Sequence, residues 1–84
     1  MKHVDTVLFV DDEPRILEGL KNRLHKEPYT ILLATSGEEG LETLENHPVD
    51  LVVSDEQMPG MCGSEFLTAV CREYPETIRI TLTG

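Results

Sequence analysis

Four short runs of hydrophobic residues are separated by stretches in which hydrophobic positions recur every three or four residues. The runs have the length and β-branched content of strands, and they cover residues 6–10, 30–34, 49–54 and 77–82. The first run is unbroken, as in a strand covered on both faces, whereas the last alternates polar and apolar residues, as in a strand with one wetter face. The pattern therefore predicts strands joined by helices.

The intervening stretches also carry signals for helix ends. Pro14 suits the first turn of a helix, where its missing N–H is not needed, and Ser36 with Glu39 forms a capping box. In the third stretch Cys71 falls among apolar residues at helical spacing, so we expect it to be a packing residue. The predicted helices run from Pro14 to about Lys26, from the Ser36 cap to about Asn46, and from Ser64 to Tyr74.

The order of these elements predicts a parallel α/β sheet with helices on both faces, because each strand-helix-strand crossover must be right-handed. Ligands bind such sheets outside the carboxyl ends of the strands. Four polar residues fall at those ends: Asp11, Asp12, Asp55 and Thr83. The expected fold and the polar residues therefore select the same edge of the sheet.

The three aspartates are a donor set suited to Mg²⁺, which prefers oxygen ligands and keeps several waters, whereas Zn²⁺ prefers His or Cys. A bound metal ion would keep Asp55 ionised, so that its carboxylate could attack a phosphorus centre and form an aspartyl phosphate. The Thr83 hydroxyl and loop amides would neutralise charge on the phosphoryl oxygens. A single aspartate after a strand is more often a turn former or helix cap, so the inference depends on the whole set.

Composition narrows the function further. The 84 residues, 39% of them hydrophobic, allow one domain with a modest core. A formal net charge of −9 disfavours direct binding to nucleic acid or anionic lipid. Without an apolar stretch long enough for a membrane span or signal peptide, a cytoplasmic location is expected. Cys62 and Cys71 lack the spacing of a metal or redox motif and are expected to be free thiols.

Three segments of the chain contain the polar residues of the expected site. They are Leu8-Phe9-Val10-Asp11-Asp12-Glu13, Ser54-Asp55-Glu56-Gln57-Met58-Pro59-Gly60-Met61-Cys62-Gly63 and Thr81-Leu82-Thr83-Gly84. Together they closely resemble the receiver domain of bacterial two-component response regulators. The resemblance implies a flavodoxin-like (CheY-like), doubly wound parallel sheet with strand order 2-1-3-4 and three helices. It also implies a signalling phosphoacceptor rather than an enzyme, capable at most of self-phosphorylation and self-dephosphorylation.

The resemblance further implies a role for each residue of the acidic site. Asp55 would accept a phosphoryl group from a phosphohistidine on a sensor histidine kinase or from a phosphotransfer protein. Asp12 and Asp55 would ligate Mg²⁺ directly, and Asp11 would do so through water. The backbone carbonyl of Gln57 would be another ligand, and its side chain would influence dephosphorylation.

The phosphoryl oxygens would be bound by the switch hydroxyl of Thr83 and by the amides of Glu56 and Gly84. Receiver domains continue with a fourth helix, a fifth strand whose lysine pairs with the phosphoryl group, and a fifth helix, yet no lysine follows Thr83 here. We therefore expect residues 1–84 to be the N-terminal portion of a single receiver domain, with weakened phosphotransfer and an output domain outside this chain. We also expect a homo-oligomer, formed through an exposed fourth strand or uncovered apolar faces.

Two other functions fit parts of the sequence. A phosphorylation-independent assembly or interaction module would explain the absent lysine but gives the acidic set no purpose. A small phosphatase of the haloacid dehalogenase type would need Asp-x-Asp after its first strand, where this chain has Asp11-Asp12-Glu13. The third helix and fourth strand also resemble receivers attached to cyclic-dinucleotide phosphodiesterase domains or to transcription-activating ATPase domains.

Overall fold

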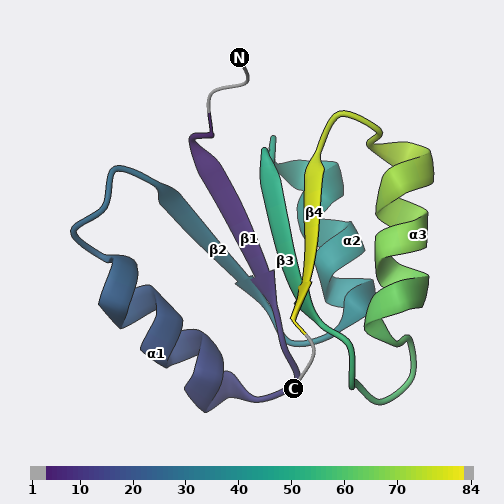
Figure 1. Cartoon of the computed structure of the whole chain (residues 1–84), viewed down its shortest axis with the longest axis horizontal. Coiled ribbons are helices and arrows are strands. Elements are labelled where there is room, and N and C mark those ends of the chain that lie inside the picture. Colours follow the sequence, from purple (N-terminus) through teal and green to yellow (C-terminus); the bar gives the residue numbers. More distant parts are fainter. Residues whose placement is uncertain (1–3, 83–84) are drawn as a thin grey trace.

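The computed structural model describes residues 4–82, in which strands and helices alternate along the chain (Figure 1). In chain order the elements are β1 (Thr6–Val10), α1 (Pro14–Leu24), β2 (Thr30–Ala34), α2 (Gly37–Asn46), β3 (Leu51–Asp55), α3 (Gly63–Glu73) and β4 (Ile78–Leu82). The predicted sequence of four strands and three helices is confirmed within this range. None of the helices in residues 4–82 has the length and apolar character needed to cross a membrane.

The sheet has the order β2-β1-β3-β4, and each neighbouring pair of strands is parallel. This arrangement confirms the predicted doubly wound topology. The chain builds β2 on one side of β1 and then crosses to place β3 on the other side, so the order reverses between β1 and β3. Val10 lies opposite Ser54 across that pair. The residues that follow β1 therefore meet the end of β3 at the edge where such folds bind ligands.

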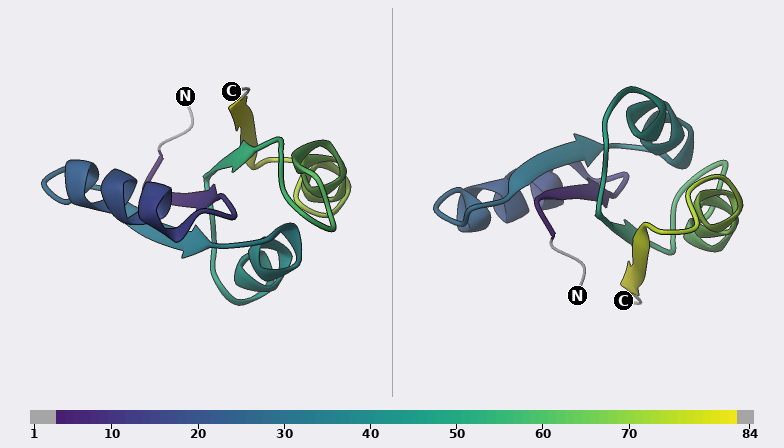
Figure 2. Two further views of the ribbon diagram at one scale, coloured as in Figure 1. Left: turned by 90° about the horizontal axis from the view of Figure 1, so that it is seen from below. Right: turned by 90° about the horizontal axis from the view of Figure 1, so that it is seen from above.

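Side chains of β1 enter two different cores, because consecutive residues of a strand point to opposite faces of the sheet. Leu8 lies in the larger core with Phe66 of α3 and Leu44 of α2. Phe9 faces the other way and packs with Leu17 of α1. The views in Figure 2 show the same division, with α1 on one face of the sheet and α2 and α3 on the other.

Some element boundaries differ from the predicted ones. α1 ends at Leu24, slightly earlier than expected, and β3 begins later than expected. α3 begins at Gly63 rather than at Ser64, because Cys62 takes the N-cap position and its amide donates to Glu65 Oε1 at 3.1 Å. This last difference matters for the site, since it places Gly63 in the first turn of the helix.

β4 departs from the alternating pattern, since all five of its residues are exposed. Its apolar side chains Ile78, Ile80 and Leu82 are 42%, 44% and 48% exposed. β4 is the last strand at one side of the described sheet. α1 lies beside β2, the strand at the opposite side (Figure 2). The prediction that Cys71 is a packing residue is wrong, because Cys71 is exposed while its neighbour Val70 takes the core-facing position on α3.

Asp50 joins three strands at the amino edge of the sheet, opposite the edge with the expected site. Its Oδ2 accepts hydrogen bonds from the amides of Asp5 and Thr6, both at 3.0 Å. Its backbone carbonyl accepts from the amide of Ile78 at 2.9 Å. Asp50 is therefore an acidic residue with a structural position at one end of β3, while Asp55 lies at the other end.

Candidate metal centre

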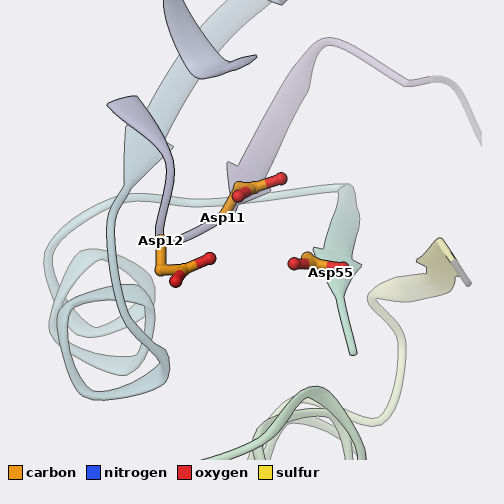
Figure 3. Close-up of side chains that lie close together, drawn as sticks. All are labelled: Asp11, Asp12 and Asp55. Atoms are coloured by element: carbon orange, nitrogen blue, oxygen red, sulfur yellow. The ribbon is translucent and has the colours of Figure 1, made fainter. Parts of the chain in front are cut away.

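The parallel pairing of β1 and β3 brings three carboxylates together. Asp11 and Asp12 follow the last residue of β1, and Asp55 is the last residue of β3. Each residue offers one carboxylate oxygen such that the three atoms all lie within 4.8 Å of one another. Figure 3 shows the carboxyl groups of Asp12 and Asp55 directed toward each other, with Asp11 beside them. The structure thus assembles the three aspartates predicted to form the acidic site.

The segment after β1 is fixed by backbone hydrogen bonds. The amide of Asp11 donates to the carbonyl oxygen of Ala34 at 3.1 Å, which extends the pairing of β1 with β2 by one residue. The amide of Glu13 donates to Asp11 Oδ1 at 2.9 Å. The carbonyl of Glu13 then accepts from the amide of Ile16 at 3.0 Å and begins α1. Asp11 and Asp12 are therefore carried on a short turn that is fastened at both ends.

The electrostatics of the cluster favour a cation. Burial raises the pKa of Asp11, and the negative charges of Asp55 and Asp12 raise it further, while the hydrogen bond from the Glu13 amide partly opposes them. Without a counter-charge, the three carboxylates repel one another. A bound cation would relieve this repulsion and favour the ionised form of each group.

The donor set fits Mg²⁺. Bonds of about 2.1 Å in an octahedron imply oxygen separations of roughly 3.0 Å between adjacent ligands and 4.2 Å between opposite ones. The three oxygens lie within 4.8 Å of one another, an upper limit only slightly above those separations. All three aspartates are partly exposed, so water can complete the coordination shell.

The backbone around Asp55 is fixed from the core side and from α3. Ser54, which is completely buried, donates from Oγ to the carbonyl oxygen of Asp55 at 2.9 Å. The amide of Gly63 donates to the carbonyl oxygen of Glu56 at 3.0 Å. A Cβ atom at position 63 would collide with the Asp55 carbonyl and would lie 2.8 Å from the Cα atom of Glu56. The first turn of α3 therefore lies directly against the segment that carries Asp55.

The loop between β3 and α3 is anchored by its hydrophobic residues. Met58 is 8% exposed and belongs to the larger core. Gly60 has a φ of 76°, a left-handed conformation that favours glycine. Met61 packs so closely on Gly37 that a Cβ atom there would lie 2.8 Å from the Met61 sulfur. These anchors set the path of the loop past the acidic cluster.

The structure describes only some of the remaining predicted site residues. Glu56 and Gln57 immediately follow Asp55, and their side chains are partly exposed and exposed respectively. Thr83 and Gly84 lie outside the described residues. Sequence reasoning missed the contacts that Ser54 and Gly63 make with the backbone of the site. The glycine at position 63 was visible in the sequence as part of a motif, but its contact depends on where α3 begins.

The fold and the acidic cluster define a doubly wound α/β protein with three aspartates gathered at the carboxyl edge of its sheet. The sequence model of the response regulator receiver domain family matches residues 7–84, and the chain belongs to this family.

The relatives that this chain matches are longer proteins, and the match covers only part of each. The chain is 39% identical over 79 residues to the hydrogenase transcriptional regulatory protein HoxA of Cupriavidus necator, covering 94% of this chain and 16% of that protein. It is 40% identical over 78 residues to the transcriptional regulatory protein GlrR of Escherichia coli, covering 93% of this chain and 18% of that protein. The chain therefore spans less than a fifth of the length of these two relatives.

Solved structures show the same fold. A signal receiver domain of an HD domain-containing protein from Pseudomonas fluorescens is 36% identical with a TM-score of 0.93, over 98% of this chain and 66% of that one. The response regulator TrrA of Thermotoga maritima, solved in complex with Mg²⁺-BeF, is 39% identical with a TM-score of 0.87, over 94% of this chain and 69% of that one. The chain thus spans about two thirds of these structures.

Proposed function

We propose that this protein is a signalling phosphoacceptor that receives a phosphoryl group on Asp55 in a Mg²⁺-dependent reaction. The observation that carries the proposal is the cluster of Asp11, Asp12 and Asp55, whose carboxylate oxygens lie within 4.8 Å of one another. The donor would be a phosphohistidine on a sensor histidine kinase or on a phosphotransfer protein. Family membership supports this function, and TrrA, a response regulator of similar structure, was solved with Mg²⁺ and BeF.

The chemistry assigned to this chain is nucleophilic. A carboxylate oxygen of Asp55 forms a bond to phosphorus while the bond from phosphorus to the donor imidazole nitrogen breaks, and the imidazole keeps that electron pair. The product is an acyl phosphate on Asp55. Mg²⁺ would be held by Asp12, Asp55 and the carbonyl of Gln57, with Asp11 acting through water, and would neutralise charge on the phosphoryl group.

The chain's own donors would position the phosphoryl group. We assign the backbone amides of Glu56 and Gly84 and the hydroxyl of Thr83 to its oxygens, and the side chain of Gln57 to the approach of the hydrolytic water. Within these 84 residues no lysine follows Thr83. A polypeptide of these residues alone would therefore be phosphorylated slowly, because a charge-assisted contact on the order of 1.5–3 kcal/mol would be missing.

The wider setting is proposed on the same basis. Residues 1–84 would be the N-terminal portion of a single receiver domain, a proposal supported by their covering 66% and 69% of two receiver structures. The relatives HoxA and GlrR are named as transcriptional regulators, which supports an output domain outside this chain and a location in the cytoplasm. Any binding to nucleic acid would belong to that output domain.

A second candidate function is assembly. The apolar residues exposed along β4 favour pairing with another chain, because an uncovered edge strand offers unpaired backbone groups. In this form the chain would act as a homo-oligomeric interaction module that does not need phosphorylation. The two candidates are separated by whether Asp55 is modified.

The phosphoacceptor function is tested with acetyl phosphate and Mg²⁺, followed by intact-mass measurement. The expected result is the mass increase of one phosphoryl group, lost on chelation of Mg²⁺ and absent in Asp55→Asn. Asp50→Asn is the matched control, because it changes an aspartate at the other end of β3 and should still be modified. Modification of the Asp55→Asn protein to the same extent would contradict the proposal.

A further inference from the structure

The first turn of α3 makes two hydrogen bonds to the residue that follows Asp55. The amide of Gly63 donates to the backbone carbonyl of Glu56 at 3.0 Å. The hydroxyl of Ser64 donates to the carboxylate Oε1 of Glu56 at 2.8 Å. Both the backbone and the side chain of Glu56 are therefore held by the same helical turn.

The peptide unit between Asp55 and Glu56 is confined on its other side as well. Its carbonyl oxygen, which belongs to Asp55, accepts the hydroxyl of buried Ser54 at 2.9 Å. The same oxygen lies so close to Gly63 that a Cβ atom at position 63 would collide with it. Only the N–H of this peptide unit, which belongs to Glu56, is assigned to a phosphoryl oxygen.

The hydrogen bond from Ser64 also determines where the charge of Glu56 lies. Although Glu56 directly follows Asp55, its carboxylate does not join the group of three in the described residues, which consists of Asp11, Asp12 and Asp55. The bond instead places the carboxylate at the N-terminal turn of α3, where the helix dipole favours negative charge. When an anion binds at Asp55, the carboxylate of Glu56 is therefore already hydrogen-bonded to Ser64.

We propose that Ser64 is a positioning residue for the phosphoryl site, acting through Glu56. Its hydroxyl restrains Glu56 so that the amide of Glu56 is oriented for the phosphoryl group and the carboxylate stays on α3. This inference rests on the proposed phosphoacceptor function and adds a residue to it. Loss of the hydroxyl would loosen the amide and release a negative charge beside the incoming anion, and both effects weaken anion binding. Neither effect weakens binding of a cation.

The structure supplies matched variants for a test. Ser64→Ala removes the hydrogen bond, whereas Ser64→Thr keeps a hydroxyl that can replace it. Thr68→Ala is the control for loss of a hydroxyl from α3, because Thr68 lies one turn further along and donates only to the backbone carbonyl of Ser64, at 2.8 Å. Glu56→Ala removes the other partner, and Ser64→Ala in that background has no hydrogen bond left to break.

Two affinities are measured for each variant of the 84-residue chain: that for Mg²⁺ by calorimetry, and that for beryllofluoride with saturating Mg²⁺ by fluorine NMR. We expect Ser64→Ala to weaken beryllofluoride binding roughly two- to tenfold, the range that corresponds to one hydrogen bond, without weakening Mg²⁺ binding. Ser64→Thr restores the affinity and Thr68→Ala leaves it unchanged. In the Glu56→Ala background, Ser64→Ala has no further effect.

The possible failures can be told apart. Equal losses of Mg²⁺ and beryllofluoride affinity in Ser64→Ala would show that Ser64 only supports the helix, and unchanged beryllofluoride affinity would show that it has no role at the site. Either result overturns the inference and leaves the phosphoacceptor function standing. Absence of both Mg²⁺ binding and beryllofluoride binding in the unmodified chain would overturn both. Absence of beryllofluoride binding alone, with Mg²⁺ still bound, would overturn the inference only, because the missing lysine contact already weakens anion binding by these 84 residues. Should Ser64→Ala not fold, Glu56→Ala tests the restraint of the amide from the other partner. Because it also removes the negative charge, a loss of beryllofluoride affinity there would come from the loosened amide, and no loss would overturn the inference.

Discussion

The Cα atom of Gly40 in α2 lies against the aromatic ring of Phe66 in α3. A Cβ atom at position 40 would lie 2.8 Å from one ring carbon of Phe66 and 2.9 Å from another. Phe66 is completely buried, and because protein interiors are close-packed we expect little room for its ring to move. This contact joins the two helices that cover one face of the sheet.

Gly40→Ala is therefore expected to destabilise the protein by about 1–3 kcal/mol, the cost of overpacking a core, despite the higher helix propensity of alanine. The control is Gly19→Ala in α1, where a Cβ atom would meet nothing within 4 Å. That change should stabilise the protein by up to about 1 kcal/mol. Urea unfolding measures both, and equal effects of the two substitutions would refute the steric explanation.

Mg²⁺ is expected to stabilise the folded chain through the acidic cluster. Because the ion binds the assembled carboxylates and not the unfolded chain, a concentration ten times the dissociation constant should add about 1.4 kcal/mol to the free energy of unfolding. Asp12→Asn should remove most of this increment. Asp50→Ala lowers stability by itself, since the amides of Asp5 and Thr6 lose their acceptor, but it should keep the increment. Thermal unfolding with and without Mg²⁺ distinguishes these results.

The pH dependence of the metal-free protein follows from Asp11. Its pKa in the folded state lies above the ordinary value of 3.8, chiefly because of burial and then because of the negative charges of Asp55 and Asp12. Protonated Asp11 is therefore favoured by folding. Its stabilising contribution is complete below pH 3.8 and is lost as the pH rises through the higher folded-state pKa.

Asp11→Asn should accordingly raise the stability of the metal-free protein at neutral pH, with a gain that disappears toward acidic pH. The asparagine Oδ1 can still accept the hydrogen bond from the amide of Glu13, so the turn after β1 is kept. Urea unfolding in the presence of a chelator, across a pH series, measures the effect. A gain that is independent of pH would mean that charge at position 11 is not its cause.

Exposure along β4 leads to a prediction about association. Ile80 is 44% exposed in the middle of this edge strand. If β4 or its apolar face mediates self-association, Ile80→Lys should shift the sedimentation profile at micromolar concentration toward the monomer. Ile16→Lys is the control, because Ile16 is 50% exposed on α1, beside β2 at the other side of the sheet. A monomeric profile for the unmodified chain would contradict the oligomer outright.

The strands and the acidic cluster could be predicted because they depend on short-range patterns. A buried parallel strand such as β1 needs a continuous apolar run, and the residue that ends it must lie at the edge of the sheet. The sequence pattern therefore predicts that Asp11, Asp12 and Asp55 lie together at one edge of the sheet.

Other features depend on how elements are rotated and where they start, which a pattern of residue types does not determine. Cys71 falls among the apolar residues of α3, yet it is exposed because Phe66 and Val70 occupy the core-facing positions. The contact of Ser64 with Glu56 requires the loop between β3 and α3 to return to the end of β3. That return depends on the buried Met58 and on the left-handed Gly60, a combination visible only in three dimensions.

The close approach of Gly63 to the carbonyl of Asp55 is expected to limit which residues can occupy position 63. Every amino acid other than glycine carries a Cβ atom, and at position 63 that atom would meet backbone rather than a side chain able to rotate aside. At Gly19, by contrast, a Cβ atom would meet nothing within 4 Å, so replacement is expected to be tolerated. Two glycines that look alike in the sequence are thus expected to differ in how they accept a side chain, since a Cβ atom has open space at position 19 and meets backbone at position 63.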